Sequence, residues 1–265
     1  VGLGAVNIQK KYDDAIMFVL ASDHLIRYKD IFLSTLESAE RIAKEDTNLV
    51  TLGIVPAYPE TGYGYIKFDH TRKLYDAYAV DRFIEKPELD VAKKYVESGQ
   101  YLWNSGMFVW KVSSILKNIQ LHMPELYGGL MRVKDSFGRA DEKEILRDVF
   151  ESVESKSVDY GVMEKAEDIY TIPGIFGWDD VGSWVALSRL RDTDDDNNTI
   201  EGNVVAYKTS DTVIQGRDKL IATVGVEHMI IVDTDDALLI SSKKNAGEIK
   251  QILEKLRQMG KEEYL

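Results

Sequence analysis

The chain has 265 residues, of which 44% are hydrophobic, and a formal net charge of −12 from 33 basic and 45 acidic side chains. This composition is enough to pack one large or two smaller domains. We find no apolar run long enough to span a membrane, no secretory leader and no basic stripe typical of nucleic-acid binders. The absence of cysteine excludes disulfides, thiolate zinc sites and thiol nucleophiles. We therefore expect a cytoplasmic protein that binds neither nucleic acid nor membrane.

An unbroken apolar run at residues 16–20 ends at the sequence Ala21-Ser22-Asp23-His24. A short run closed by small and polar residues predicts a central parallel strand that is covered on both faces. Ligands of open α/β sheets bind beyond the carboxyl ends of such strands, so Asp23 lies where chemistry is expected. The alternative is that Asp23 only turns the chain or caps the helix that begins around Tyr28.

The pattern after this strand predicts a βαβ unit. Apolar residues recur at helical spacing over residues 31–44, and a second buried-type strand follows at 49–55. Strand, helix and strand with short joins indicate a right-handed crossover. The other strands expected in this part of the chain are 65–68, 77–84, 107–110 and 169–172. The expected helices are 89–98, closed by Gly99, a mostly helical stretch from 112 to 165 in which Pro124, Asp141 and Ser157 begin helices, and 185–190.

The composition changes at residues 192–198, DTDDDNN, which we interpret as a solvated linker. Short strands are expected beyond it at 204–207, 212–214, 220–224, 229–232 and 237–240, followed by an amphipathic helix at 246–259. This spacing predicts a small β domain, either a flattened helix or the edge of a sandwich. We therefore divide the chain into a domain at 1–191 and a smaller one at 192–265.

Acidic or amide side chains occur repeatedly at predicted strand ends and glycine-bounded turns. Strand ends of a parallel sheet converge on one crevice, so side chains distant in sequence can meet there. Carboxylates without a histidine or cysteine cluster are the ligands that hard cations prefer, chiefly Mg²⁺. Neither a hydrolase nucleophile elbow nor a P-loop is present. The pattern favours a metal-dependent sugar or phosphate pocket, with the candidates Asp23, Glu60, Glu85, Asn104, Asp179 and Asp180.

Six segments follow one another in a specific order: VLASDHLI, PETGYGYIKF, FIEKP, YLWNSGMFVW, SVDYGVMEK and FGWDDVGSW. With them the chain closely resembles the mannose-1-phosphate guanylyltransferases, which make GDP-mannose. The segment at residues 202–240 also resembles the C-terminal region of that family. The resemblance implies an α/β fold. It consists of a nucleotidyltransferase domain with a Rossmann-like mixed sheet, then a short left-handed β-helix segment and a C-terminal helix.

The resemblance also implies roles for individual residues. Asp23 and Asp180 would hold Mg²⁺, with Asp179 the weaker choice in the GWDDVGSW turn. The candidate catalytic residues are Asp23, Asp180 and Lys86. The net charge of −12 strengthens the expectation of a metal, because the surplus of carboxylates repels phosphates.

Four residues are implied to bind substrate. Glu85 and Asn104 would bind mannose hydroxyls, Lys86 the sugar phosphate, and Gly64 a substrate group through its backbone. The alternative for the loop at 56–68 is a plain glycine-bearing bend. The printed sequence does not contain the glycine-rich nucleotide loop of the family, and we expect this loop to precede Val1.

The implied reaction is attack by the phosphate oxygen of mannose 1-phosphate on the α-phosphorus of GTP, with pyrophosphate as leaving group. Such a transfer needs no protein nucleophile. Two alternatives are a related sugar-1-phosphate nucleotidyltransferase with another base or sugar, and a non-catalytic regulatory subunit that senses sugar nucleotides. The apolar C-terminal strands and helix predict a homodimer, although they could instead dock on the α/β domain of the same chain.

Overall fold

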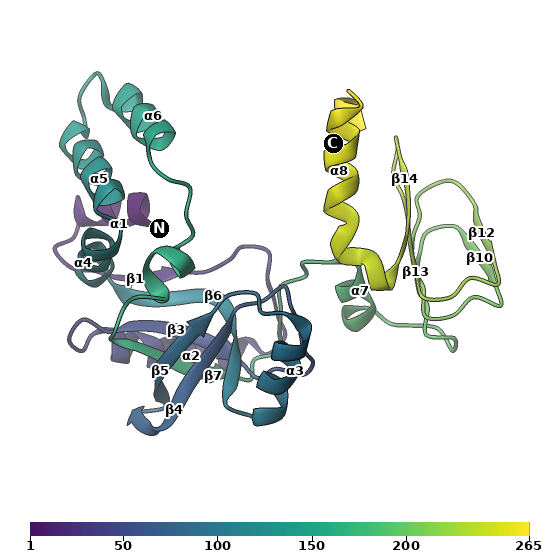
Figure 1. Ribbon diagram of the computed structural model, residues 1–265, viewed down its shortest axis with the longest axis horizontal. Helices are drawn as coiled ribbons and strands as arrows, with labels where there is room; N and C mark the ends of the chain where they lie inside the picture. Colours follow the sequence, from purple (N-terminus) through teal and green to yellow (C-terminus); the bar gives the residue numbers. More distant parts are fainter. Residues whose placement is uncertain (265) are drawn as a thin grey trace. The chain divides into compact units, whose positions relative to one another are not determined.

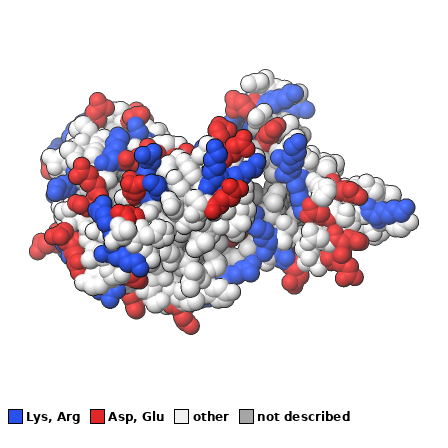
Figure 2. All heavy atoms as spheres, turned by 60° about the horizontal axis from the view of Figure 1, so that its bottom comes forward, with Lys and Arg blue, Asp and Glu red and all other residues white. Residues whose placement is uncertain are grey.

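The computed structural model describes residues 1–264 and consists of two compact units, Val1–Trp178 and Asp179–Leu265 (Figure 1). Within the described residues, no helix combines the length and the apolar character needed to cross a bilayer. On the face drawn in Figure 2, basic and acidic side chains are interspersed over the first unit.

The first unit is built on a mixed sheet of six strands in the order β1-β6-β3-β7-β5-β4. β6 pairs antiparallel with β1, β3 and β4, so the sheet closes on itself. β3 pairs parallel with β7 and is buried along its whole length, as its apolar sequence predicts. The strands are β1 (Ile16–Val19), β3 (Leu49–Ile54), β4 (Tyr65–Leu74), β5 (Ala77–Ile84), β6 (Tyr101–Lys111) and β7 (Ile169–Gly174).

Helices cover both faces of this sheet (Figure 1). Successive residues of β3 point to opposite faces, so Leu49 packs into one core and Val50 into the other. The first core involves α1 (Gly2–Gln9), α4 (Val112–His122), α5 (Pro124–Ser136) and the π-helix η1 (Asp159–Met163), with α6 (Glu142–Ser152) packed on α5. The second involves α2 (Lys29–Ala43) and α3 (Leu89–Ser98).

The helix predictions of the first unit are largely confirmed. α3 ends at Gly99, which has a φ of 64° and closes the helix in the left-handed conformation that glycine adopts without steric cost. Pro124 begins α5. Asp141 does precede α6, but its carboxylate binds the side chain of Arg139 at 2.6 Å and makes no cap bond. Asp23 does not cap α2 either, since the N-cap residue is Tyr28.

The environment predicted for β1 is wrong. β1 is at the end of the strand order, its described partner is the antiparallel strand β6, and Phe18 is 40% exposed. An apolar run indicates that a strand forms, but it does not say which strands will be its neighbours. β1 and β3 both run antiparallel to β6, and therefore run parallel to each other with β6 between them. The helix between them in the chain, α2, still makes a crossover.

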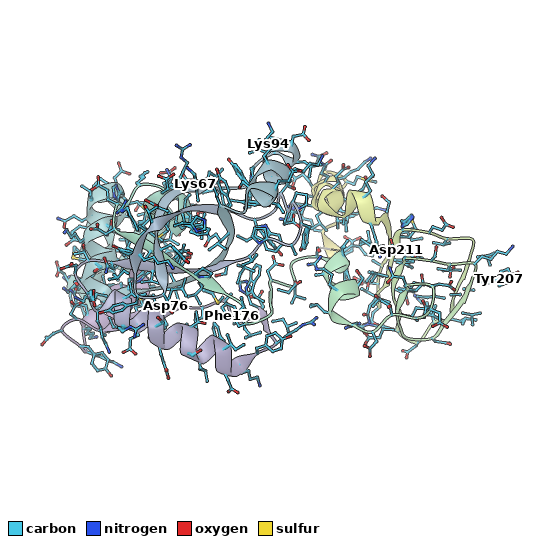
Figure 3. The ribbon with its side chains drawn as sticks, turned by 90° about the horizontal axis from the view of Figure 1, so that it is seen from below. Lys67, Asp76, Lys94, Phe176, Tyr207 and Asp211 are labelled. Carbon is cyan, nitrogen blue, oxygen red and sulfur yellow. The ribbon has the colours of Figure 1, made fainter. Side chains whose placement is uncertain are left out.

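The second unit stacks short parallel strands. β9 (Thr199–Glu201), β11 (Val213–Gln215) and β13 (Met229–Asp233) pair in parallel, and β14 (Leu238–Ser242) adds antiparallel to β13. β10 (Val204–Tyr207) and β12 (Ile221–Val224) form a second parallel pair, from which Tyr207 projects outward (Figure 3). Strands of consecutive turns thus lie above one another, which is a β-helix-like arrangement rather than a sandwich.

Helical segments flank this stack. α7 (Trp184–Leu190) precedes it and is capped by Ser183, whose hydroxyl accepts the N–H of Ala186. The expected closing helix follows as η2 (Lys243–Glu248), α8 (Ile249–Gln258) and η3 (Glu262–Tyr264). The remaining short strands of the chain are β2 (Leu25–Ile26) and β8 (Trp178–Asp179).

The segment interpreted as a linker is a hydrogen-bonded turn. The carboxylate of Asp194 accepts the backbone N–H groups of Asp196 and Asn198 at 3.1 and 2.7 Å, and the side-chain amide of Asn198 at 3.1 Å. This turn belongs to the second unit. The domain boundary after residue 191 stays a prediction.

Candidate active site

Gly64, Glu85 and Asn104 meet where the start of β4 lies between the end of β5 and the first half of β6. The carbonyl oxygen of Gly64 accepts the backbone N–H of Asn104 at 2.8 Å. A Cβ atom at position 64 would collide with Oε2 of Glu85 and would lie 3.5 Å from the Cβ of Asn104. The carboxylate of Glu85 can take this position because residue 64 has no side chain. Three of the predicted substrate-binding residues form one cluster.

Asn104 is held by a β-bulge in β6. The register between β3 and β6 shifts between Thr51 and Gly53, and Gly106 on the bulged strand has a φ of 71°. β6 begins at Tyr101, so Asn104 lies within a strand, whereas the sequence predicted that it only leads into one. The bulge directs the N–H of Gly106 back to Oδ1 of Asn104 at 3.2 Å.

Glu85 is a largely buried carboxyl group. Its side chain is 15% exposed, and the ammonium of Lys86 lies 3.4 Å from Oε1. Burial raises the pKa of Glu85, the negative charge of Asp159 raises it further, and Lys86 opposes both effects. Glu85 therefore keeps a proton to a higher pH than an exposed glutamate does.

Lys86 has a strained backbone. Its φ is 47°, in the left-handed region that a side chain disfavours, and Pro87 follows it. Strain of this kind costs about 1–3 kcal/mol and concentrates at functional sites. The side chain of Lys86 is 59% exposed, and its role toward the sugar phosphate stays a prediction.

Asp159 is part of this cluster, although no role was predicted for it from the sequence. It is the first residue of η1, and its Oδ1 accepts the side-chain N–H of Asn104 at 2.7 Å. The sequence feature that could have pointed to Asp159 is the segment SVDYGVMEK. This segment supports the family resemblance and the prediction that Ser157 begins a helix. Ser157 does accept the N–H of Tyr160, at 3.4 Å.

A series of aromatic side chains connects this cluster to the loop that carries Asp23. Trp103 packs edge-on against Tyr63 with 5.2 Å between ring centroids, Tyr63 against Trp178 at 5.4 Å, and Trp178 against His24 at 5.3 Å. Tyr63 precedes Gly64, Trp103 precedes Asn104, and His24 follows the exposed Asp23. Ring contacts therefore fix the backbone next to the candidate residues of the first unit.

The GWDDVGSW turn contributes its aspartates to the second unit. Asp179 accepts the backbone N–H of Val181 at 2.8 Å and forms an ion pair with Arg189 at 3.0 Å, while Asp180 accepts the N–H of Gly182 at 3.0 Å. That Asp179 is the weaker ligand of the two stays a prediction. Over the described part of the chain, no group of three or more histidine, cysteine, aspartate or glutamate side chains is arranged to hold a metal ion.

Glu60, the remaining candidate, shapes its own loop. Its carboxylate accepts the N–H of Gly62 at 2.8 Å, and its carbonyl oxygen accepts the hydroxyl of Tyr65 at 2.9 Å. These bonds hold the PETGYGY loop against the start of β4. Glu60 therefore has a structural role in the described fold.

The family model of the nucleotidyl transferases matches residues 3–197. The chain belongs to this family. A second family model, the MannoseP isomerase/GMP-like beta-helix domain, matches residues 202–256. These two matches establish the mixed α/β nucleotidyltransferase domain and the β-helix-like domain behind it.

Several relatives of the chain are named as mannose-1-phosphate guanylyltransferases. The enzyme of Salmonella typhimurium is 38% identical over 95% of this chain and 52% of its own length, and that of Klebsiella pneumoniae is 36% identical over 100% and 56%. The crystal structure of mannose-1-phosphate geranyltransferase from Thermus thermophilus has a TM-score of 0.84 at 31% identity, over 96% of this chain and 73% of that chain. The resemblance to the mannose-1-phosphate guanylyltransferase family is thus confirmed. The chain spans about half the length of the curated relatives it matches.

Proposed function

We propose that the protein transfers a guanylyl group from GTP to mannose 1-phosphate, giving GDP-mannose and pyrophosphate. The observation that carries this proposal is the cluster of Gly64, Glu85 and Asn104 in a chain whose relatives are named for this reaction. The cluster combines a carboxyl group, an amide and an adjacent ammonium, which suits a molecule that carries both hydroxyls and a phosphate.

In this proposal Glu85 and Asn104 bind the sugar hydroxyls. The carboxylate of Glu85 accepts from a hydroxyl, and the amide of Asn104 donates to one. Lys86 neutralises the sugar phosphate, and Gly64, whose carbonyl is bonded to Asn104, offers its N–H. The transfer requires no covalent intermediate, because the phosphate oxygen of mannose 1-phosphate is itself the nucleophile and binding only has to position it.

Asp23 and Asp180 are the residues that would hold Mg²⁺. Each side chain supplies only oxygen ligands, and Mg²⁺ is commonly held by one or two carboxylates together with waters and substrate phosphates. A bound Mg²⁺ would neutralise developing charge on the phosphates. We also infer that the second unit is a left-handed β-helix, that the sheet of the first is Rossmann-like, and that the active protein is a cytoplasmic homodimer.

The sugar ligands can be tested with substrate analogues. Turnover is measured for mannose 1-phosphate and for its 2-deoxy and epimeric analogues, with wild type, Glu85→Gln and the exposed control Glu88→Gln. Loss of a hydroxyl that binds a buried carboxylate should cost wild type about 1–3 kcal/mol, or roughly 5- to 150-fold in kcat/KM. Glu85→Gln should lose part of this discrimination and Glu88→Gln none. Equal discrimination by Glu85→Gln and wild type would remove Glu85 from the sugar site.

Two alternatives are separated by simple assays. A related transferase for another base or sugar would prefer ATP, UTP or dTTP over GTP, or another sugar 1-phosphate, in a direct kinetic comparison. A regulatory subunit would bind GDP-mannose in calorimetry without releasing pyrophosphate from any nucleotide. The presence of Asp23, Glu85, Lys86 and Asp180 favours the enzyme.

A further inference from the structure

The hydrogen bonds of Asn104 define the orientation of its side-chain amide. Oδ1 lies 3.2 Å from the N–H of Gly106, which can only donate, so this atom must be the oxygen. The hydroxyl of Thr51 lies 3.3 Å from the same oxygen and 3.3 Å from the carbonyl of Met107. Thr51 is fully buried, whereas Gly106 is exposed.

The nitrogen side of the amide is fixed by Asp159. Nδ2 donates one of its two hydrogens to Oδ1 of Asp159 at 2.7 Å, a length typical of charge-assisted bonds. The oxygen accepts from Gly106, and the second hydrogen on Nδ2 is available to a ligand. Asn104 can therefore donate to a sugar hydroxyl.

We propose that Asp159 is a positioning residue, which locks the amide of Asn104 as a hydrogen-bond donor toward the sugar. This inference rests on the proposed function, because it concerns the same sugar site. Asp159 starts η1, whereas Asn104 lies in the β6 bulge, 55 residues earlier in the chain. The bond thus joins a helical segment to the sheet beside the cluster of Gly64 and Glu85.

This role is distinct from a general effect of negative charge. Glu164, at the C-terminal end of η1, also contributes negative potential at Glu85, as Asp159 does, while Lys86 contributes positive potential. Glu164 is exposed, and the side-chain amide of Asn104 donates to Asp159 instead. A charge effect would be shared by Asp159 and Glu164, whereas orientation of the amide belongs to Asp159.

The test is a double-mutant cycle in the purified full-length protein. Binding of mannose 1-phosphate is measured by calorimetry for wild type, Asp159→Leu, Asn104→Ala and the double variant, with Glu164→Gln as the charge control. Thermal unfolding identifies any variant that fails to fold. Asp159→Asn is the conservative rescue, because its amide oxygen can still accept from Asn104 without the charge.

We expect Asp159→Leu to raise the Kd for mannose 1-phosphate about tenfold, the usual effect of a lost bond to a charged group. It should have no further effect in the Asn104→Ala background, Asp159→Asn should stay within about threefold of wild type, and Glu164→Gln should bind like wild type. Equal effects of Asp159→Leu in both backgrounds, or a matching loss in Glu164→Gln, would overturn the proposal.

Failure of the proposed function is seen separately. It would appear as a wild-type protein that forms no GDP-mannose from GTP and mannose 1-phosphate. In that case the cycle is repeated with the sugar 1-phosphate that binds tightest in a panel. A tenfold effect of Asp159→Leu that disappears in the Asn104→Ala background would still support the positioning role, and additive effects would still overturn it.

Discussion

Trp178 donates its indole N–H to Nδ1 of His24 over 3.0 Å, and so joins two segments that lie 154 residues apart in the chain. Because Nδ1 accepts this bond, a neutral His24 carries its proton on Nε2. His24 directly follows Asp23, and Asp180 follows Trp178 by two residues. The bond therefore fixes the backbone beside one proposed metal ligand and close in sequence to the other.

Replacing Trp178 by Phe should destabilise the first unit by about 1 kcal/mol, because it removes the N–H and keeps an aromatic ring. His24→Leu removes the acceptor of the same bond. In urea unfolding, the double variant should be less destabilised than the sum of the two single variants, with a coupling free energy of about 1 kcal/mol. Strictly additive losses would show that the bond contributes nothing to stability.

The two aspartates of the GWDDVGSW turn should respond differently to the same substitution. Asp180→Asn should lower turnover by orders of magnitude with little change in stability, because it weakens the binding of a metal ion that would supply several kcal/mol of charge stabilisation. Asp179→Asn is the matched control: it breaks the ion pair with Arg189 and should mainly affect unfolding. The measurements are turnover against Mg²⁺ concentration and thermal melting. Near-normal activity of Asp180→Asn at saturating Mg²⁺ would remove it from the site.

The sequence predicts where helices and strands form better than it predicts which elements lie beside them. Helical spacing and capping residues predict α2 and α3 within about two residues and the start of α5 at Pro124, since these signals are local. The prediction that β1 is a central strand is wrong, because five apolar residues fit any strand with a buried face. The acidic composition of residues 192–198 predicts a linker, because composition says nothing about the bonds that Asp194 makes.

The candidate site shows the same division between local and long-range information. Gly64, Glu85 and Asn104 were found because they lie in motifs of an identifiable family, and the structure brings them together. Asp159 lies in such a motif too, but its role depends on a contact with Asn104 across 55 residues. No spacing rule in the sequence predicts a contact of that kind.

The raised pKa of Glu85 makes stability depend on pH. The folded protein holds this proton to a higher pH than the unfolded chain, whose carboxyl has the ordinary pKa of 4.5. The stabilisation is complete below that pH and is lost as the pH rises through the folded-state pKa. Glu85→Gln should therefore unfold with a flatter pH profile, and its stability relative to wild type should improve from acidic to neutral pH. Urea unfolding at closely spaced pH values checks this. Parallel profiles of the two proteins would contradict it.

The second unit exposes apolar side chains on its last helix and strand. None of the residues of α8 is buried. Its apolar side chains Ile252 and Leu253 are 49% and 37% exposed, and Leu256 lies on the same helix. Leu238 and Ile240 of β14 are each 58% exposed. Covering exposed apolar side chains is favourable by about 25 cal/mol per Å², and large uncovered apolar patches are uncommon on monomers.

We predict that a second copy of the chain covers this surface, so that the protein is a homodimer with α8 in the contact. Leu253→Glu places a charge in the proposed interface and should weaken association at least tenfold, because an unpaired charge buried in an apolar contact is strongly unfavourable. Gln251→Glu introduces the same side chain at an exposed polar position of the same helix and should leave the dimer intact. Light scattering at low micromolar concentration measures the mass of all three proteins. A monomeric wild type would contradict the prediction, since the exposed face of α8 would then need no partner. A Leu253→Glu dimer as stable as that of Gln251→Glu would place the contact elsewhere on the chain.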